Sequence, residues 1–215
     1  MRRLSLSGVA YVGCFVLAVV LYGSGAGSGS SEIVAYYASH ANRLRQIAGF
    51  AALLVGCVFL LVYVVVLARS VVRDEPFSTI ALLSGGASAL LLAAGNALWA
   101  ATAFTAEIEP GYRVSPQAHL LIEDAGFIVV VSGMALAIPL VVLTSLVVKR
   151  SRRLPRWFAY LGAVATAGLA TAYWYFPLLA FLVWVACGSV LLASGEAVSR
   201  ATDASSGSRD VASAG

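Results

Sequence analysis

The chain has 215 residues, of which 60% are apolar and only 11% are charged, and its formal net charge is +4. Charged residues make up about a quarter of a typical soluble domain, so this composition excludes the soluble class and predicts an integral membrane protein. About six spans with short loops would use nearly the whole length. We therefore expect an all-α, polytopic transmembrane helix bundle in the lipid bilayer, without a catalytic domain and without affinity for nucleic acid.

Six apolar runs are each long enough to cross a hydrocarbon core of about 30 Å, at about 1.5 Å of helix per residue. They predict a six-helix transmembrane domain over residues 1–198. The tail over residues 199–215 is rich in Ser, Ala and Gly, and we expect it to be disordered and cytoplasmic. The expected spans cover residues 6–22, 47–68, 79–104, 125–148, 157–174 and 177–195.

The first apolar run has two interpretations. It follows the basic start of the chain and precedes a small-residue stretch from Gly23 to Ser31. This arrangement fits a signal peptide cleaved near Ala26, and it also fits an uncleaved first span. We expect the uncleaved helix. Cleavage would leave a bundle of five spans.

Polar side chains gather at one rim of the predicted bundle, at the starts of the second and fourth spans. Ser115 and Pro116 form a good helix start, so His119 and Glu123 should lie one turn apart on the same face. The residues that we expect to form an outer polar cluster are His40, Asn42, Arg43, Arg45, His119, Glu123 and Asp124.

Charge pairing across this rim is expected from depth. Arg45 and Asp124 each fall roughly 19 Å from the centre of their span at 1.5 Å per residue. Opposite charges at one level near the edge of the hydrocarbon gain by meeting, so we expect Arg43 or Arg45 to pair with Glu123 or Asp124. The pair would close the outer end of the bundle and frame a polar vestibule.

The third span carries small residues at every fourth position, which would form a ridge that another helix can approach closely. Asn96 is the strongly polar side chain well inside this span, and we expect it to face protein because lipid offers no hydrogen bonds. It serves either an interhelical hydrogen bond or a contact with a pore or ligand. The ridge consists of Gly85, Ala89, Ala93, Ala97 and Ala101.

The second and fourth spans share a short likeness. Ala48-Gly49-Phe50 and then Gly56 in one span match Ala125-Gly126-Phe127 and then Gly133 in the other. The same offset carries the start of the third span onto the start of the fifth. Two parallel hairpins of common origin would explain this, and so would coincidence in a chain so rich in Ala and Gly.

Basic residues are distributed unevenly between the two sides of the predicted bundle. Cytoplasmic loops carry the excess of Lys and Arg, so we expect both termini in the cytoplasm. The cluster from Lys149 to Arg156 has a second interpretation, a contact with anionic lipid headgroups. One side receives Arg2, Arg3, Arg69, Arg73, Lys149, Arg150, Arg152, Arg153, Arg156, Arg200 and Arg209, and the other receives Arg43, Arg45 and Arg113.

The chemistry of most membrane enzymes has no signature in the sequence, which contains no HExxH, GxSxG or GxxxxGK[ST] motif. Cys14, Cys57 and Cys187 each lie in an apolar run without CxxC spacing, which is typical of small buried hydrophobes and not of disulfides or metal ligands. His40 and His119 lie near helix starts and do not fit a buried bis-histidine haem. We expect no cofactor, no metal and no enzymatic activity.

Three short motifs mark helix starts. Asn42-Arg43-Leu44-Arg45 leads into one helix, Asp124-Ala125-Gly126-Phe127 opens another, and Leu154-Pro155-Arg156-Trp157 precedes the fifth span. Together they resemble a large uncharacterised group of bacterial multi-pass integral membrane proteins, over about residues 36–192. The resemblance implies a multi-pass fold and no activity. With thirteen Arg against one Lys, which suggests a high-GC genome, it leads us to expect the inner membrane of a bacterial cell.

Three function classes stay open. The first is a non-enzymatic component or regulator of a membrane assembly, with a membrane-protein partner or a second copy of the chain. The second is a carrier for a small molecule, lipid or ion with an outward-facing polar vestibule, and the third is a membrane enzyme. Small-residue helix faces and the lack of catalytic motifs favour the first class.

Overall fold

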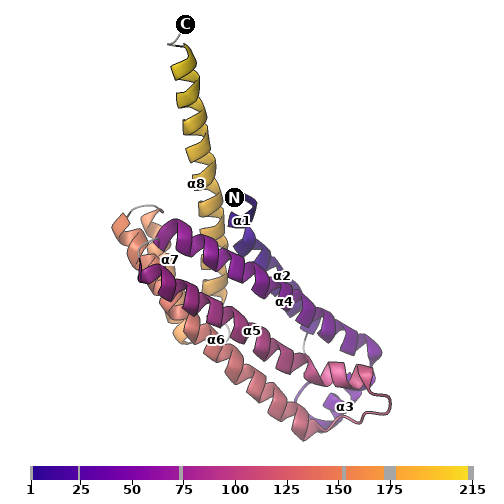
Figure 1. Ribbon diagram of the computed structural model, residues 1–215. Coiled ribbons are helices and arrows are strands. Elements are labelled where there is room, and N and C mark those ends of the chain that lie inside the picture. The colour runs from indigo at the N-terminus through magenta and orange to yellow at the C-terminus, as the bar shows by residue number, and fades with distance from the viewer. Residues whose placement is uncertain (1, 24, 73–74, 152–153, 172–177, 213–215) are drawn as a thin grey trace.

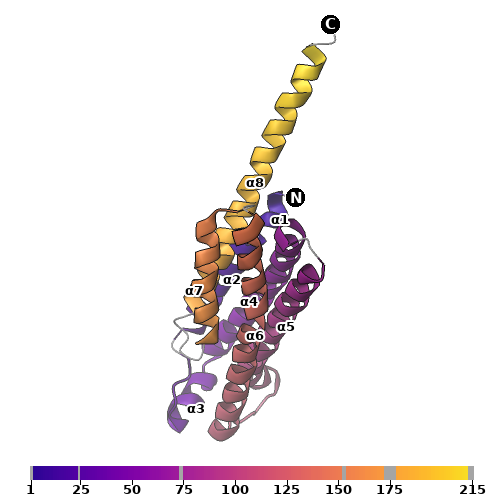
Figure 2. The same cartoon turned by 90° about the vertical axis from the view of Figure 1, so that its left-hand side faces the viewer.

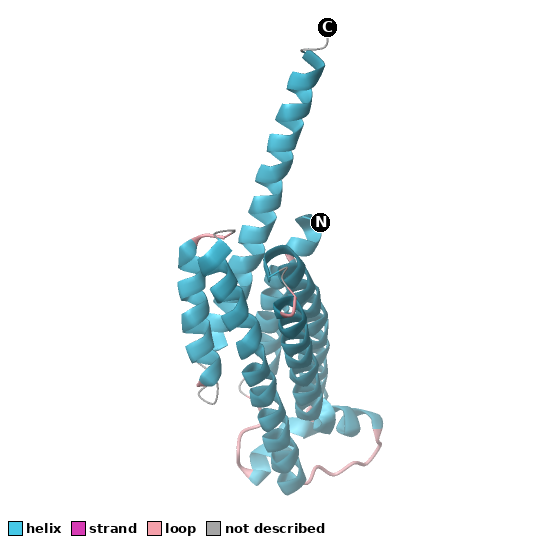
Figure 3. Ribbon diagram, turned by 60° about the vertical axis from the view of Figure 1, so that its left-hand side comes forward, coloured by secondary structure: helices cyan, strands magenta, loops and turns pink. Residues whose placement is uncertain are grey.

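The computed structural model describes residues 2–23, 25–72, 75–151, 154–171 and 178–212, with side chains described between Leu4 and Gly195. Within these ranges the regular secondary structure is entirely helical, which confirms the all-α prediction (Figures 1 and 3). The helices are α1 (Arg2–Ser5), α2 (Ser7–Tyr22), α3 (Ser30–Ala38), α4 (His40–Leu67), the π-helical turn η1 (Ala68–Val72), α5 (Phe77–Ile108), α6 (Pro116–Ser151), α7 (Arg156–Ala170) and α8 (Leu178–Ala212).

The long helices form a closed ring, in which each packs on the next along the chain and α8 returns to α2. Helix α5 lies between α4 and α6, and α3 lies across one end of the bundle (Figures 1 and 2). The N-terminus lies at the opposite end, where α8 leaves the bundle (Figure 1). We call the end with α3 the outer end, after its predicted orientation.

Four helices are long and apolar enough to cross a membrane: α4 with η1, α5, α6 and the Leu178–Gly195 part of α8. Many large apolar side chains are exposed on the bundle, which a protein surrounded by lipid sustains and a soluble one does not. The structure therefore supports a membrane-embedded protein but does not confirm six spans. Helices α2 and α7 have 16 and 15 residues, roughly 24 and 22 Å at 1.5 Å each. The predicted end of the fifth span falls in 172–177, outside the described residues.

Helix α3 occupies a stretch that the sequence analysis treated as a loop. The side chain of Glu32 accepts a hydrogen bond from the backbone N–H of Gly29 at 3.3 Å and so caps the first turn. Ile33 and Tyr37, one turn apart, are both buried and pack with Ala103 of α5. A nine-residue helix cannot cross a membrane, so a search for long apolar runs misses it.

Helix α2 is an integral part of the bundle. Tyr11 and Ala18 are each 1% exposed, and the helix packs along α4. Its removal would uncover Gly49 and Gly56 of α4, both of which face it closely. Helix α2 therefore contributes to the core, and the uncleaved first helix stays a prediction.

The likeness between the second and fourth spans extends to their contacts. A Cβ atom added to Gly49 would lie 3.4 Å from the carbonyl oxygen of Ala18, and one added to Gly126 would lie 2.9 Å from the carbonyl oxygen of Gly95. The offset of about 77 positions that relates Gly49 to Gly126 also relates Ala18 to Gly95. Both helices of the pair α2 and α4 are therefore in the same register as those of α5 and α6.

The same register holds one helical turn further along both helix pairs, and the next glycine pair shares only its neighbouring helix. Gly56 faces the Cβ atom of Cys14 and Gly133 that of Leu91, each at 3.0 Å from an added Cβ atom. Gly85 packs on α4, and its equivalent Gly162 packs on α6. Coincidence in composition does not predict matched contacts on both partners, so the structure favours two parallel hairpins of common origin.

The predicted small-residue ridge of the third span is buried at one end only. Gly85 and Ala89 are buried, Ala93 and Ala101 are partly buried, and Ala97 is exposed. A strict four-residue spacing advances by about 40° per step on a helix of 3.6 residues per turn, so the ridge turns away from the neighbouring helix. The face that packs on α6 instead contains Ser88, Leu92, Gly95 and Trp99.

Helix α8 continues to Ala212 and extends beyond the bundle (Figures 1 and 2). A lone helix that leaves a bundle has only its own backbone hydrogen bonds to hold it, and these are marginal in water. The expected disorder of residues 199–215 therefore stays a prediction.

Candidate functional site

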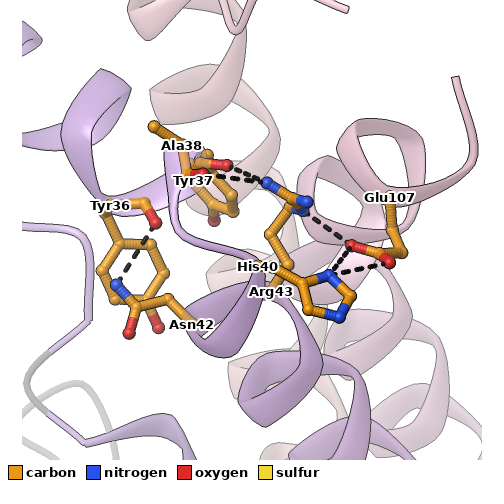
Figure 4. A network of polar contacts seen from close by, with 7 residues as sticks. All are labelled: Tyr36, Tyr37, Ala38, His40, Asn42, Arg43 and Glu107. Atoms are coloured by element: carbon orange, nitrogen blue, oxygen red, sulfur yellow. Dashed lines mark hydrogen bonds and ion pairs between the residues drawn. The ribbon is translucent and has the colours of Figure 1, made fainter. Parts of the chain in front are cut away.

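The predicted outer polar cluster is built around Glu107, in the last turn of α5 (Figure 4). Its carboxylate accepts a hydrogen bond from Nε of Arg43 at 2.7 Å and lies 3.0 Å from Nδ1 of His40. The Arg43 side chain is 17% exposed and that of Glu107 is 26% exposed. The ion pair joins the start of α4 to the end of α5 and is largely shielded from solvent.

The same arginine holds α3 in place. Nη1 of Arg43 donates to the carbonyl oxygens of Tyr37 at 2.7 Å and Ala38 at 3.3 Å, and Asn42 donates to the carbonyl oxygen of Tyr36 at 3.2 Å (Figure 4). All three carbonyls lie in the last turn of α3, where a positive charge is favourable, and that of Tyr36 also accepts a hydrogen bond from the backbone N–H of Ser39. Arg43 and Asn42 thus fix α3 over the rim.

His119 lies under α3 and is 5% exposed. Its ring meets that of Tyr37 edge to face with centroids 5.0 Å apart, and its Nδ1 lies 3.2 Å from the hydroxyl of Thr102. Its Nε2 lies 3.6 Å from Glu123, one turn along α6, as the helix start at Ser115 predicts. Burial raises the pKa of Tyr37 to about 12. His119 therefore joins α3, α5 and α6.

The expected pairing of Arg43 or Arg45 with Glu123 or Asp124 is wrong for the described residues. Arg43 pairs with Glu107, Glu123 lies beside His119, and Arg45 and Asp124 have no ion pair there. Depth places these charges at one level, but it does not say which helices are neighbours. Because α5 stands between α4 and α6, the carboxylate nearest to Arg43 belongs to α5.

Arg45 lines a separate hollow of about 580 Å³ at the outer end. Asn42 and Tyr36 lie on one side of the hollow and Tyr22 on another, beside the turn that Gly23 forms with its left-handed φ of 60°. The described residues that line it include no carboxylate. Burial raises the pKa of Tyr36, and the positive charge of Arg45 opposes this rise.

Asn96 is fully buried next to this hollow. The hydroxyl of Tyr22 donates to Oδ1 of Asn96, and Nδ2 of Asn96 donates to the carbonyl oxygen of Phe50 at 3.3 Å. The side chain therefore faces protein and joins α2, α4 and α5. Of the two interpretations of Asn96, the interhelical hydrogen bond is the one that this geometry displays.

A second, smaller cavity of about 120 Å³ lies deeper in the bundle and is almost wholly apolar. Tyr22 borders both this cavity and the outer hollow. The inner cavity also touches Leu53, Trp99 and Met134, so it lies between the two hairpins. Tyr22 thus separates a polar space from an apolar one.

Sequence reasoning missed Tyr22 and Glu107, the two residues around which the outer end is organised. Glu107 lies just beyond the predicted third span, and a search for carboxylates near helix ends on the Arg43 side would have found it. Tyr22 closes the first apolar run, where an aromatic residue is typical of a membrane interface.

No protein-family model, no curated protein and no solved structure matches this chain. The resemblance to uncharacterised bacterial membrane proteins therefore stays a prediction. In the described part of the chain, no three His, Cys, Asp or Glu side chains are close enough together to hold a metal ion.

Proposed function

We propose that this protein is a non-enzymatic membrane component of six spans that binds a small organic anion at its outer end. The observation that carries the proposal is the position of Tyr22, which stands between a polar hollow and an apolar cavity and is held there by Asn96. This arrangement suits a ligand with a charged head and an apolar body.

The charge of the ligand follows from Arg45. Its guanidinium lines the hollow without an ion pair, whereas the neighbouring Arg43 is neutralised by Glu107. A guanidinium offers planar donors that match a carboxylate or phosphate. Asn42 and the ring of Tyr36 supply a further polar group and an apolar surface.

The apolar body of the ligand would lie toward Tyr22. The hydrogen bond to Asn96 holds this side chain across the entrance to the inner cavity, and rotation of the side chain would join the two spaces. The cavity volume of about 120 Å³ limits the body to a group of a few carbon atoms.

The inner end of the bundle favours binding over free conduction. Trp184 stacks on Phe158 with centroids 5.4 Å apart and on Phe181 with centroids 6.1 Å apart, and all three rings are buried. Tyr63 meets Trp184 edge to face. Aromatic packing of this density blocks a continuous water path.

Thermal stabilisation of the purified protein by pentanoate tests the proposal. Pentanoate should raise the melting temperature of the wild type, and the uncharged analogue pentanol should raise it less. Arg45→Gln should abolish the effect of pentanoate, while Arg113→Gln, a matched change of an exposed arginine outside this hollow, should leave it unchanged. Equal stabilisation of the Arg45 variant and the wild type would refute an anion site here.

A role in a membrane assembly is the second candidate, and the outward-facing part of the third-span ridge favours it. Ala94 and Ala97 are exposed on α5, where small side chains allow another helix to approach closely. The partner would be another membrane protein or a second copy of this chain. Ala97→Cys in a variant without native cysteines should give disulfide-linked dimers if the partner is a second copy, with Leu83→Cys as the exposed control on the same helix.

A further inference from the structure

A groove with basic residues at one end runs along the outside of the bundle between α6 and α7. Its volume is about 650 Å³. Lys149, in the last turn of α6, and Arg156, the first residue of α7, lie at the end next to the connecting loop. From there the groove extends to Val142 on α6 and Thr166 on α7, about 10 to 15 Å at 1.5 Å per residue.

The two charges are free to bind a ligand. Lys149 and Arg156 are both exposed, and neither has an ion pair among the described residues. The described residues that line the groove include no carboxylate. The positive end of the α7 dipole lies at Arg156 and the negative end of the α6 dipole lies near Lys149, so the two dipoles offset each other and the attraction for an anion comes from the two side chains.

The rest of the groove is apolar in character. The hydroxyl of Ser145 donates to its own helix, to the carbonyl oxygen of Val141 at 2.7 Å, and that of Thr166 donates to Gly162 at 2.9 Å. Neither hydroxyl therefore needs a partner from the groove. Leu146 lies on one wall, and the small side chain of Ala163 leaves the space between the helices open.

Tyr160 completes the amphiphilic pattern. It lies one turn after Arg156 on the same side of α7 and is 69% exposed. Tyrosine near the end of a membrane helix places its ring among the upper acyl segments and its hydroxyl among the headgroups. The order along the groove is therefore basic, then aromatic, then aliphatic.

We infer that this groove is a specific site for one anionic phospholipid of the surrounding bilayer. The phosphate lies between Lys149 and Arg156, and an acyl chain runs past Leu146 and Ala163. A neutral phospholipid fills the apolar part equally well but leaves both cations without a counter-charge. The inference does not depend on the proposed outer anion site, because the two sites share no residue.

Lipid retention in vesicles of equal phosphatidylglycerol and phosphatidylcholine tests this site. After mild extraction, mass spectrometry of the intact protein should show phosphatidylglycerol bound in preference to phosphatidylcholine. Each basic side chain near an anionic lipid surface favours binding by about five-fold. Lys149→Gln with Arg156→Gln should therefore weaken this preference about 25-fold, and each single variant about five-fold.

Two matched controls separate the groove from general attraction. Arg69→Gln with Arg150→Gln removes the same charge from exposed positions outside the groove and should keep the preference. Ala163→Phe fills the groove without changing charge and should remove the bound lipid, whereas Ala167→Phe, exposed on α7 outside the groove, should not.

Three results would overturn the inference. The first is unchanged lipid preference in the Lys149 and Arg156 variants, and the second is an equal loss in the Arg69 and Arg150 control. The third is full retention in the Ala163 variant. The single variants provide the same comparison if the double variant is not monodisperse.

Discussion

The hydroxyl of Tyr22, at the end of α2, donates a hydrogen bond to the side chain of Asn96 in α5. Because Asn96 is fully buried, its side chain cannot exchange this partner for bulk water. Hydrogen bonds between membrane helices contribute about 0.6 kcal/mol on average, and the largest about 1.7 kcal/mol. The bond is therefore strong enough to fix a side chain and weak enough to open on the ligand binding that we propose.

Tyr22→Phe tests this bond. We expect the free energy of unfolding in lipid to fall by about 0.5 to 1.5 kcal/mol, because the Asn96 oxygen loses its donor while its amide keeps the carbonyl of Phe50. A double-mutant cycle with Asn96→Ala should give a coupling energy of the same size. Tyr112→Phe, at an exposed position in the loop between α5 and α6, serves as the control. Strictly additive effects would show that the bond does not form.

The close packing at two glycines predicts how Gly→Ala substitutions change the stability of the protein. A Cβ atom at Gly126 would lie 2.7 Å from the Trp99 ring and 2.9 Å from the Gly95 carbonyl oxygen. Overpacking of this kind costs about 1 to 3 kcal/mol, so Gly126→Ala should destabilise the protein. Gly49→Ala should cost less, because its nearest contact would be 3.2 Å from the Tyr22 ring.

Gly13→Ala is the matched control for these variants. Nothing lies within 4 Å of a Cβ atom at this exposed position of α2. Replacing a helical glycine with alanine removes backbone freedom and is favourable by about 0.5 to 1 kcal/mol. Unfolding measurements that rank Gly126→Ala no worse than Gly13→Ala would contradict the close packing of α5 on α6.

The corrected orientation of α5 predicts unequal effects along the small-residue ridge. Ala89→Leu should lower stability and expression, because Ala89 is 1% exposed in the core. Ala93→Leu should have an intermediate effect, and Ala97→Leu should have almost none in the isolated protein. Similar losses for Ala89 and Ala97 would restore the straight ridge that the sequence predicted.

The network at the rim predicts different roles for its two charged residues. Arg43→Gln breaks the ion pair and also the bonds to two carbonyl groups at the end of α3, which should cost about 1 to 2 kcal/mol. Glu107→Gln should cost less, because Arg43 keeps its carbonyl partners. Hydrogen exchange should show faster exchange of α3 amides in the Arg43 variant alone. Equal exchange in both variants would mean that Arg43 does not hold α3.

Topology is tested by reporter fusions. With six spans and cytoplasmic termini, a fusion after Gly215 should be active as a cytoplasmic reporter and one at Glu107 as an external reporter. The charge asymmetry between the two sides motivates this expectation. A C-terminal fusion that is active only outside would rule it out.

The sequence predicts those features of the fold that depend on hydrophobic length. Apolar runs locate α2, α4, α5, α6 and α8, and Ser115 with Pro116 locates the start of α6 within one residue. Helix α3 was not predicted from the sequence, because its burial depends on only two large side chains, Ile33 and Tyr37, and on the position of α5. Short elements are defined by their neighbours and not by their own composition.

The sequence predicts which polar residues lie near the rim, but it does not predict which of them form ion pairs. His40 and Arg43 share one carboxylate at the rim, but it is Glu107 and neither Glu123 nor Asp124. Membrane depth gives only one of the three coordinates of a side chain. The order of the helices around the ring gives another, and it decides which charged residues are neighbours. That order follows from packing contacts such as those of Gly95 with Gly126, which spacing along one chain does not reveal.

Two aromatic residues occupy equivalent places in the two hairpins, and they have diverged. Tyr22 lies against Gly49 and Trp99 lies against Gly126. Tyr22 bonds across to Asn96, whereas the indole N–H of Trp99 donates to the carbonyl oxygen of Glu123 at 3.0 Å. The two equivalent places thus hold their aromatic side chains differently, one through a side-chain partner and the other through a backbone carbonyl. Two equivalent positions in one chain can therefore hold different side chains with different partners, as equivalent positions do in the two subunits of a heterodimer.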